Sequence, residues 1–406
     1  MTDVHIIGGG PAGLFAGIAA LRSGRSALVS EEHARVGEPE ACSGLISKSG
    51  LEALRALAGV DYSRAKINTI SSAKIVCGKE EFIVSPKEET AVLISRKEFD
   101  SLAAEKFVQE GGKLELGKKV TREFEADCVI GTDGPASLVA ERFGFPKIKS
   151  YVASMQGDFA YKCDDAHCAT LYISSRDFPG FFGWVIPKNE NEAKIGLGVT
   201  LPRHPLAHYR RFLDKLGVKG KPSHEFAAVI PTSVRAKTAM RQGKRSVLLA
   251  GDAAGQVKAT TGGGVFFGAS CGMLAGKNIG EPEKYERAWR AQYGLDLALH
   301  RKLRTALDFT GGEPPAALVS AAKALFFDEL LSERGKMDRW SGMLRPSTLS
   351  AYAGILKDKF PEKFVRIWKS DVHFVSKHKM HQTSSDASLD ADRVYISKNK
   401  ATKKRE

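Results

Sequence analysis

The chain has 406 residues, of which 43% are hydrophobic and 27% are charged, a composition typical of an ordinary soluble globular protein large enough for about two domains. Its formal net charge is +14, from 61 Lys+Arg against 47 Asp+Glu, which favours anionic lipid, phosphate or nucleic acid as partners. No apolar run is long enough to cross a membrane, the N-terminus leaves no room for a signal peptide, and no nucleic-acid-binding motif is present. We therefore expect a cytoplasmic protein that binds no nucleic acid.

The first 31 residues have the pattern strand, glycine turn, helix, strand, acidic residue. An apolar strand at 4–7 leads into a turn from Gly8 to Gly13, an apolar helix follows, and a second strand ends at Glu31. Gly8 permits a tight turn, Gly10 lets the backbone approach a pyrophosphate, and Gly13 lets the helix pack closely against the sheet. Free N–H groups at the helix start attract phosphate, while Glu31 can accept hydrogen bonds from a ribose and disfavours a 2′-phosphate. This stretch predicts a site for FAD or NAD rather than NADP.

The next part of the chain leaves this pattern and then returns to it. Short apolar bursts between turn residues predict a small antiparallel piece over 66–94. Ser95 with Glu98 three residues later forms a capping box, which predicts the start of an amphipathic helix. A buried strand at 126–130 then runs into the sequence Gly-Thr-Asp-Gly at 131–134.

The remaining chain alternates between strands and helices. The predicted elements are, in order, strands over 151–200, a helix at 204–216, a buried strand at 247–250, a small-residue helix to about Lys277 and a helical pattern over 285–368. The strand at 247–250 leads into Gly-Asp-Ala-Ala-Gly at 251–255, and a glycine run follows at 262–264. A polar, Lys-rich end predicts a solvated flexible tail, with contact to a membrane surface as the alternative.

The six cysteines are scattered, which predicts reduced thiols rather than a disulfide framework. Cys163, His167 and Cys168 lie close together and could indicate a metal site. No second pair of ligands has a matching spacing, so we expect no metal.

The glycine motifs at 8–13, 131–134 and 251–255 look like parts of one nucleotide site. Together they resemble the flavoproteins of the p-hydroxybenzoate hydroxylase type, in which FAD lies across all three motifs. Within that group the chain, over about residues 4–300, most resembles the geranylgeranyl reductases, which include archaeal digeranylgeranylglycerophospholipid reductase. The resemblance implies an α/β fold in which a Rossmann-like FAD-binding domain is interleaved with an antiparallel-sheet substrate domain, followed by a C-terminal helical segment.

The resemblance also implies domain boundaries and cofactor residues. The FAD-binding domain would comprise 1–65, 95–150 and 240–284, the substrate domain 66–94 and 151–239, the helical segment 285–370, and the flexible tail 371–406. The implied FAD-binding residues are Gly8, Gly10, Ala12, Gly13, Glu31, Cys42, Ser43, Gly44, Arg96, Asp133, Gly134, Asp252, Ala253, Gly263 and Gly264. Asp252 would accept hydrogen bonds from the ribityl hydroxyls, and the helix after Gly264 would direct its positive end at the isoalloxazine ring. Thr132 departs from the family, which more often has a small residue there.

Two further stretches favour the reductases within this group. Cys42-Ser43-Gly44 resembles their Cys-small-Gly motif close to the flavin, and residues 182–187 resemble their aromatic-x-Trp-x-Phe-Pro motif in the substrate cavity, with Phe182 and Ile186 as departures. The predicted catalytic residues are Cys42 and Trp184, and the predicted substrate-binding residues are Phe181, Phe182, Trp184 and Pro187. The structural alternatives are a buried thiol in a turn for Cys42, an exposed first-turn arginine for Arg96 and a core residue for Trp184.

The resemblance implies reduction of isolated C=C bonds of geranylgeranyl chains, on archaeal-type glycerophospholipids first and on geranylgeranyl diphosphate or a prenylated chlorophyll precursor as alternatives. Lys and Arg would hold the head-group phosphate in peripheral contact with the inner face of the cell membrane. Cys42 or a bound water would donate the proton, and NAD(P)H or a ferredoxin would supply electrons. One rival is an FAD-dependent monooxygenase or halogenase on the same scaffold, which would consume oxygen. Another is a non-enzymatic prenyl-binding carrier, which would not need the intact segment around Asp252.

Overall fold

The structure is a computed structural model that describes residues 2–86, 90–121, 124, 126–309, 337, 338 and 341, with the backbone alone at 306–309. The chain divides into one compact unit, Met1–Ala353, and a second unit, Gly354–Glu406, which lies outside the described residues. The predicted flexible tail and most of the predicted helical segment after Phe309 also lie outside them.

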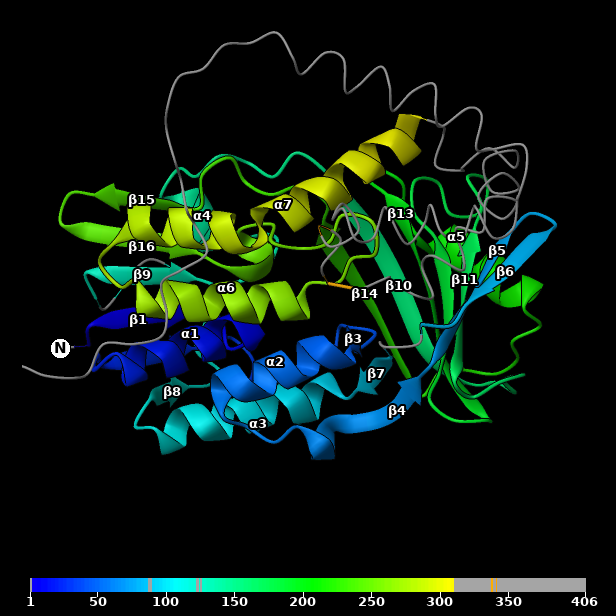
Figure 1. Ribbon diagram of the computed structural model, residues 1–406, viewed down its shortest axis with the longest axis horizontal. Helices are drawn as coiled ribbons and strands as arrows, with labels where there is room; N and C mark the ends of the chain where they lie inside the picture. Colours follow the sequence, from blue (N-terminus) through cyan, green and yellow to red (C-terminus); the bar gives the residue numbers. More distant parts are fainter. Residues whose placement is uncertain are drawn as a thin grey trace, which may run out of the picture. The chain divides into compact units, whose positions relative to one another are not determined.

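A six-stranded sheet forms the first layer of the compact unit (Figure 1). Its strands, in spatial order, are β15 (Ala239–Gln242), β16 (Arg245–Leu249), β9 (Cys128–Gly131), β1 (Val4–Ile7), β2 (Ala27–Ser30) and β8 (Lys113–Glu115). All pairings are parallel except that of β15 with β16. Strands β1, β2 and β9 are buried on both faces, which explains their nearly continuous apolar sequences.

A seven-stranded sheet lies beside the first one. Its order is β14 (His224–Pro231), β10 (Tyr151–Ala160), β13 (Glu192–Thr200), β12 (Gly183–Pro187), β11 (Cys168–Ile173), β5 (Ser72–Cys77) and β6 (Glu80–Val84). All pairings are antiparallel except that of β5 with β11, which is parallel. Helix α5 (Leu206–Lys215) covers one face, where Tyr209 and Phe212 pack on Val185 and Ile195.

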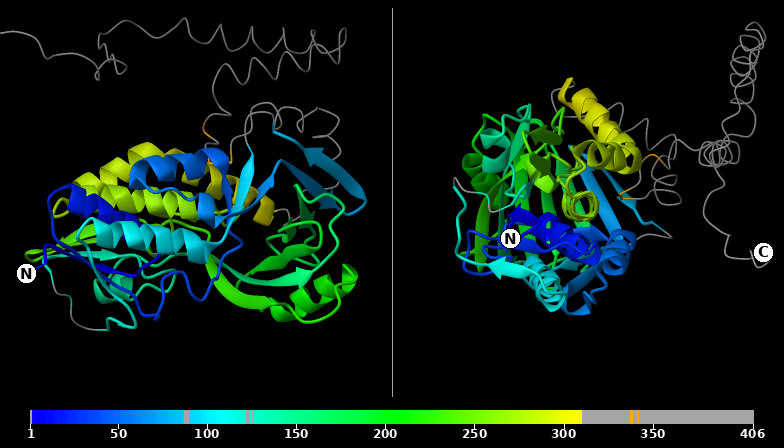
Figure 2. Two further views of the ribbon diagram at one scale, coloured as in Figure 1. Left: turned by 90° about the horizontal axis from the view of Figure 1, so that it is seen from below. Right: turned by 90° about the vertical axis from the view of Figure 1, so that its left-hand side faces the viewer.

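A three-stranded antiparallel sheet of β3 (Leu45–Ser47), β7 (Ala91–Ile94) and β4 (Lys66–Ile70) lies at the junction of the two larger sheets (Figure 2). The stretch 66–94 is therefore divided between two sheets rather than forming one antiparallel piece. The hairpin of β5 and β6 extends the seven-stranded sheet, while β7 is buried along its whole length and joins β3 and β4.

The remaining helices pack mainly on the six-stranded sheet. They are α1 (Pro11–Arg22), α2 (Lys48–Ala58), α3 (Arg96–Gln109), α4 (Leu138–Arg142), α6 (Val265–Lys277) and α7 (Pro282–Phe309), with short 3-10 turns η1 (Ser63–Ala65) and η2 (Gly251–Ala253). Among the described residues, no helix is both long enough and apolar enough to span a membrane. The predicted fold class, an α/β Rossmann-like domain interleaved with a largely antiparallel sheet, is confirmed.

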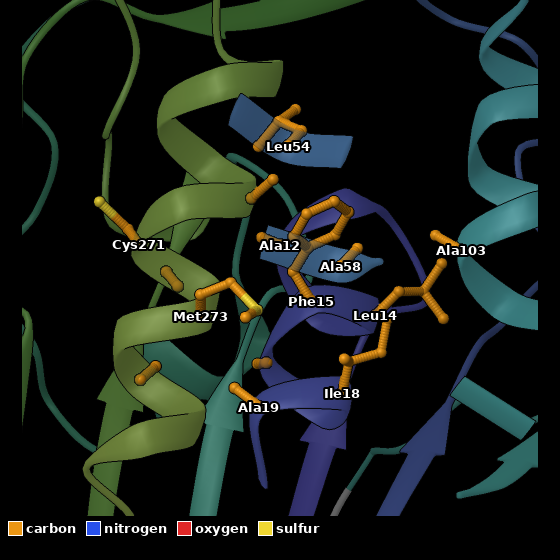
Figure 3. Packing of buried hydrophobic residues seen from close by; sticks show 14 of the residues in the cluster. Ala12, Leu14, Phe15, Ile18, Ala19, Leu54, Ala58, Ala103, Cys271 and Met273 are labelled. Atoms are coloured by element: carbon orange, nitrogen blue, oxygen red, sulfur yellow. The ribbon is translucent and has the colours of Figure 1, made fainter. Parts of the chain in front are cut away.

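Helices α1 and α6 are in close contact and run in the same direction (Figure 3). Gly272 of α6 lies on Ala12 of α1, and Gly276 lies on Ala16 one turn further along. A Cβ atom at Gly272 would lie 2.1 Å from the carbonyl oxygen of Ala12, so only glycine allows this approach. The parallel arrangement brings the N-termini of both helices to the same end of the sheet.

Only half of the predicted capping box forms at the start of α3. The Ser95 hydroxyl accepts from the backbone N–H of Glu98 at 3.3 Å, as expected for an N-cap. The Glu98 carboxylate instead pairs with Arg64 at 3.3 Å. The backbone N–H of Ser95 donates to the carbonyl of Ala65, so it needs no side-chain acceptor.

Candidate active site

The glycine turn after β1 is held by backbone packing and by one hydroxyl. Gly8 has a φ of +106°, and a Cβ at Gly13 would lie 2.0 Å from the carbonyl oxygen of Gly8. The hydroxyl of Thr132, the residue that departs from the family pattern, donates to the carbonyls of Ile7 at 2.8 Å and Gly8 at 2.9 Å. Nothing lies within 4 Å of the Cβ position of Gly10, so the backbone there is open to a ligand.

Glu31 lies beside this turn, where the βαβ pattern predicts it. Its Oε2 accepts from the backbone N–H of Gly9 at 2.7 Å, and its Oε1 accepts from the backbone N–H of His33 at 2.9 Å. The carboxylate is therefore held at the start of α1 by the backbone on both sides. Oε1 also lies 2.6 Å from the Nδ1 of the His33 ring, so Oε2 is the oxygen that keeps a second lone pair with which to accept from a ribose hydroxyl.

Both parallel helices begin without a side-chain cap. The N-cap of α1 is Gly10 and that of α6 is Gly264, and neither can offer a side-chain acceptor to the free N–H groups. Gly262, just before α6, has a φ of +73° and lies beside Phe181 and Ile230 of the seven-stranded sheet. Two uncapped helix ends with their partial positive charges thus face one region, which favours an anionic ligand.

Asp133 has a local structural role that the motif did not reveal. Its carboxylate accepts from the Ser137 hydroxyl at 2.6 Å and from the backbone N–H of Val139 at 3.0 Å, so it holds the N-terminus of α4. Burial raises the pKa of Asp133, although the Ser137 hydrogen bond limits the rise. Gly134 beside it has a φ of +77° and open space at its Cβ position. Any contact of this segment with a ligand therefore falls to the backbone rather than to the carboxylate.

Arg96, Asp252 and Cys42 come together although they are far apart in the sequence. The Arg96 side chain is only 16% exposed and forms a bidentate pair with Asp100, at 2.8 and 3.2 Å. It is therefore not an exposed first-turn arginine. Burial opposes its charge, but Asp100 and a hydrogen bond with the Cys42 thiol raise the pKa of Arg96 above its usual value. Burial raises the pKa of Asp252 to about 6, and the nearby Arg96 guanidinium limits that rise.

The segment Cys42-Ser43-Gly44 leads from this cluster into β3. Gly44 has a φ of +77°, and a Cβ there would lie 2.1 Å from the carbonyl oxygen of Ile94, so the segment runs tightly against β7. The backbone N–H of Gly44 donates to the Cys42 sulfur at 3.4 Å. Ser43 is partly exposed between them. The turn fixes the Cys42 thiol beside Arg96.

The aromatic residues of the predicted substrate motif form one cluster on the seven-stranded sheet. Phe181 and Phe182 are stacked with ring centroids 4.3 Å apart, and Phe182 meets Trp184 edge to face at 5.7 Å. Trp184 lies across Gly196, where a Cβ would be 2.6 Å from the indole ring. The indole Nε1 donates to the Oε1 of Gln156 at 2.9 Å. A core role for Trp184 fits its burial, and a cavity role fits its contact with Phe182, which stacks on Phe181 beside Gly262.

Pro187 does not join the aromatic cluster. It is the last residue of β12 and, by strand alternation, lies on the same side as Val185, whose side chain packs under α5. Its carbonyl oxygen accepts from Asn68 at 3.1 Å. Ala253, the remaining predicted cofactor residue, is fully buried in η2 next to Asp252, and Ala12 lies at the contact of α1 with α6.

A buried ion pair near the glycine run was not predicted. The Lys258 ammonium lies over Gly263 and pairs with Asp338 at 2.7 Å, and Asp338 in turn accepts from the hydroxyl of Ser47. Nearby, His300 has a pKa lowered to about 4, first by burial and then by Lys258. No sequence signal pairs residues this distant. Within the described chain, no group of three or more His, Cys, Asp or Glu side chains is placed to hold a metal ion.

The comparisons with known proteins agree with this geometry. The chain is 30% identical over 361 residues to digeranylgeranylglycerophospholipid reductase 2 of Methanothermobacter thermautotrophicus, covering 78% of this chain and 90% of that relative. A geranylgeranyl bacteriochlorophyll reductase-like crystal structure from Thermoplasma acidophilum has a TM-score of 0.70 at 20% identity, over 89% of this chain and 97% of that one. A probable FAD-dependent monooxygenase from Pseudomonas aeruginosa has a TM-score of 0.58 at 16% identity, over 77% and 96%. No family model matches the chain.

The sheet order, the open glycine turn and the paired helix ends define an FAD-dependent oxidoreductase of the flavoprotein class. Its cofactor is FAD, and the residues fit it, since the backbone is open at Gly10 and the Asp252 carboxylate lines the same region. More particularly, the chain belongs to the digeranylgeranylglycerophospholipid reductase family. The predicted family, enzyme class and cofactor are thereby confirmed.

Proposed function

We propose that this protein saturates isolated C=C bonds of geranylgeranyl chains, with archaeal-type isoprenoid glycerophospholipids as its substrate. The observation that carries the proposal is the aromatic cluster of Phe181, Phe182 and Trp184, whose member Phe181 lies beside Gly262 just before α6. An apolar, aromatic wall next to a flavin site suits a hydrocarbon chain better than a polar substrate. The names of the relatives in the family point to the same lipid class.

Each part of the site has a role in this proposal. Gly10 and the start of α1 bind the pyrophosphate of FAD, and Glu31 accepts from the adenosine ribose. Asp252 accepts from the ribityl hydroxyls, and the start of α6 at Gly264 favours the negative charge of the reduced ring. The further cofactor residues are Gly8, Ala12, Gly13, Cys42, Ser43, Gly44, Arg96, Asp133, Gly134, Ala253 and Gly263. When bound and reduced, FAD supplies a hydride.

The protein's own side chains serve the second half of the reaction. An isolated double bond is not polarised by a carbonyl, so its reduction needs a proton at one carbon and develops positive charge at the other. The faces of Phe181, Phe182 and Trp184 stabilise such charge and exclude water from the chain. Cys42 orients the reacting bond against the cofactor, and Pro187 supports the wall from the end of β12.

Electron supply and lipid delivery complete the proposal. No second dinucleotide fingerprint occurs in the sequence, so the reductant, NAD(P)H or a ferredoxin, binds only transiently. The net charge of +14 favours peripheral contact with the anionic inner face of the cell membrane, where Lys and Arg hold the lipid phosphate.

The decisive experiment is an anaerobic single turnover. The purified flavoprotein is reduced with dithionite, a geranylgeranyl phospholipid is added, and flavin reoxidation is followed together with the lipid mass. Reoxidation with mass gains in steps of two hydrogens is the expected result. A flavin that stays reduced until air is admitted would contradict the proposal and favour a monooxygenase or halogenase. Lipid binding with no turnover under either condition would favour a prenyl carrier.

A further inference from the structure

The inner face of the seven-stranded sheet, meaning the face that carries Trp184, contains a fully buried amide. Gln156 on β10 is 0% exposed, and its Oε1 accepts from the Trp184 indole at 2.9 Å. Its Nε2 has no hydrogen-bond partner among the described residues. Leaving a buried donor unpaired is unfavourable, so this N–H is positioned to donate to a group that is not part of the chain.

Asp158, two residues further along β10, has an unsatisfied atom on the same face. Its Oδ2 lies 3.2 Å from the Lys188 ammonium. Its Oδ1 lies 3.9 Å from the Lys194 ammonium, too far for a hydrogen bond, and has no other partner in the described chain. Alternate residues of a strand lie about 7 Å apart, so a donor on Gln156 and an acceptor on Asp158 can bind the same small molecule.

Lys188 connects this buried carboxylate to the surface. Its ammonium lies 3.6 Å from Glu192, whose side chain is 48% exposed. Polar groups therefore lead from solvent through Glu192 and Lys188 to Asp158, and from there to Gln156 and the aromatic cluster. No other function of the site uses this path.

The remaining charged groups around Asp158 hold the path in place. Lys194 on β13 pairs with Glu40 at 3.1 Å and is only 2% exposed. His224, the register partner of Asp158 on β14, contacts the carbonyl of Glu40 at 2.7 Å. Because the Lys194 ammonium pairs more closely with Glu40, it does not form a hydrogen bond with the Oδ1 of Asp158.

We propose that Gln156 and Asp158 hold one water molecule between them, and that this water passes the proton that the double bond receives. The inference rests on the proposed function. The water accepts from the Nε2 of Gln156 and donates to the Oδ1 of Asp158, the two or more polar partners that a buried water requires. A prenyl chain carries no oxygen at its double bonds, so the reacting part of the lipid cannot take this place.

The proton transfer conserves atoms and charge. Lys188 gives a proton to the Oδ2 of the Asp158 carboxylate, and rotation of the carboxyl group turns this proton toward the water. The water accepts it as it gives one of its own protons to an alkene carbon. The other alkene carbon receives the hydride that the cofactor supplies. Lys188 then regains a proton from solvent beside Glu192, and the water and both side chains return to their starting states.

The test compares variants of the holoenzyme in anaerobic single turnovers run in H2O and in D2O. Asp158→Asn and Gln156→Leu should bind FAD normally but reoxidise it about 100-fold more slowly with lipid, within the usual range for a lost proton-transfer group. The solvent isotope effect should rise in both variants because proton transfer becomes rate-limiting. Gln156→Met has nearly the same volume and removes both the amide donor and the acceptor for Trp184, whereas Gln156→Glu keeps an acceptor for Trp184 and replaces the amide donor by a carboxyl group, so a comparable loss in both would separate water binding from Trp184 positioning.

Asp177→Asn is the matched control, because Asp177 also lies 3.2 Å from a lysine, Lys215, but on the far side of the sheet. It should behave as the wild type. If Asp158→Asn fails to fold, Lys188→Gln breaks the same path from its outer end and should raise the isotope effect as well. Wild-type rates in the Asp158 and Gln156 variants, or slower rates with an unchanged isotope effect, would overturn the inference alone. If the lipid does not reoxidise the reduced flavin of the wild-type protein, the proposed function is wrong and this inference is wrong with it.

Discussion

Asp252 has a buried carboxyl group whose ionised form needs hydrogen-bond donors from a ligand to become favourable. The side chain keeps partial exposure although protein surrounds it, as expected for a group that lines an open cavity. Burial raises its pKa from 3.8 to about 6, so the charged form is disfavoured in the cofactor-free protein. Hydrogen bonds from the ribityl hydroxyls would reverse this preference.

Replacement of Asp252 by asparagine should therefore act in opposite directions on stability and on cofactor binding. At pH 7 the buried charge is removed, so the cofactor-free Asp252→Asn protein should melt at a higher temperature than the cofactor-free wild type. Its FAD affinity should fall by about tenfold or more because charge-assisted hydrogen bonds are lost. Thermal melts and flavin fluorescence titrations measure the two effects. A variant that loses both stability and FAD affinity would indicate a purely structural role.

The same carboxyl predicts a pH dependence whose sign can be derived. In the cofactor-free protein the folded state holds the Asp252 proton more tightly than the unfolded chain, so this contribution to stability is lost as pH rises from about 4 to about 6. FAD favours the ionised form, so its binding releases the proton and its affinity should weaken as pH falls through 6. Dissociation constants measured from pH 5 to pH 8 would show this slope in the wild type. In Asp252→Asn the slope should disappear.

Cys42 tests the catalytic side of the site. Cys42→Ala should retain FAD but slow lipid-dependent flavin reoxidation by about tenfold to 100-fold, because the reacting bond loses a neighbour that orients it. The solvent isotope effect should stay at the wild-type value, since the inferred proton path runs through Asp158 and does not include the Cys42 thiol. Cys163→Ala is the control, because Cys163 is a partly buried thiol that packs against the hydrophobic cluster between the seven-stranded sheet and α5. Full turnover by Cys42→Ala would remove Cys42 from the catalytic residues.

Sequence predicted the residues whose role is local and missed those whose role depends on strand register. The turn from Gly8 to Gly13 is recognisable because its spacing alone determines its shape. Gln156 meets Trp184 only because β13 lies between their strands and carries Gly196 at the crossing point. For Asp133 the sequence motif was recognised but the role of the side chain was not, since its carboxylate is bound to Ser137 and the start of α4.

At the scale of secondary-structure elements, periodicity located the helices well and the sheets less completely. The helix predicted to start after Ser95 is α3, and the predicted strand at 247–250 overlaps β16. The division of 66–94 between two sheets could not be predicted, because alternating apolar residues do not specify which strand they pair with. The half-formed capping box has a similar cause, since the partner that removes Glu98 from it, Arg64, lies outside the helix.

The close contact of α1 with α6 determines how far apart the N-termini of these two helices lie. Gly272→Ala should destabilise the protein by about 1–3 kcal/mol, the usual cost of overpacking, because the new methyl group would meet the Ala12 carbonyl. Gly294→Ala, in α7, is the matched control. Its nearest neighbour would be the Arg290 side chain at 3.5 Å, so this variant should be neutral or gain up to about 1 kcal/mol in helix propensity. Denaturant unfolding of both holoproteins measures the difference.

FAD affinity should follow stability in the Gly272→Ala variant. The helix ends at Gly10 and Gly264 would move apart if α1 and α6 were separated by a methyl group. An intact FAD affinity together with a large loss of stability would contradict this coupling. It would show that the positions of the two helix N-termini do not depend on the contact between α1 and α6.

At the scale of the whole molecule, the interleaving of the chain explains how distant motifs form one site. Strands β1, β9 and β16 are adjacent in the sheet, so the motifs that follow them end at the same edge. This arrangement was predictable through the family resemblance, because three motifs of known order constrain the sheet. The polar path from Glu192 to Gln156 was not, because it joins residues from two antiparallel strands, β13 and β10, and from the turn after β12.

The net charge of the molecule supports a last prediction, on binding to lipid surfaces. A protein with a charge of +14 should sediment with anionic vesicles and not with zwitterionic ones. The binding should weaken between about 0.05 and 0.5 M salt, because the Debye screening length becomes shorter. Lys403→Gln with Lys404→Gln removes two charges from the Lys-rich C-terminal sequence, while Lys113→Gln with Lys118→Gln removes two that pair with Glu115. Since Glu115 offsets one of the two charges of Lys113 and Lys118, the C-terminal pair should weaken vesicle binding more, at about 1 kcal/mol per charge near the surface. Equal effects of the two pairs would show that overall charge, rather than the C-terminal sequence, brings the enzyme to its lipid.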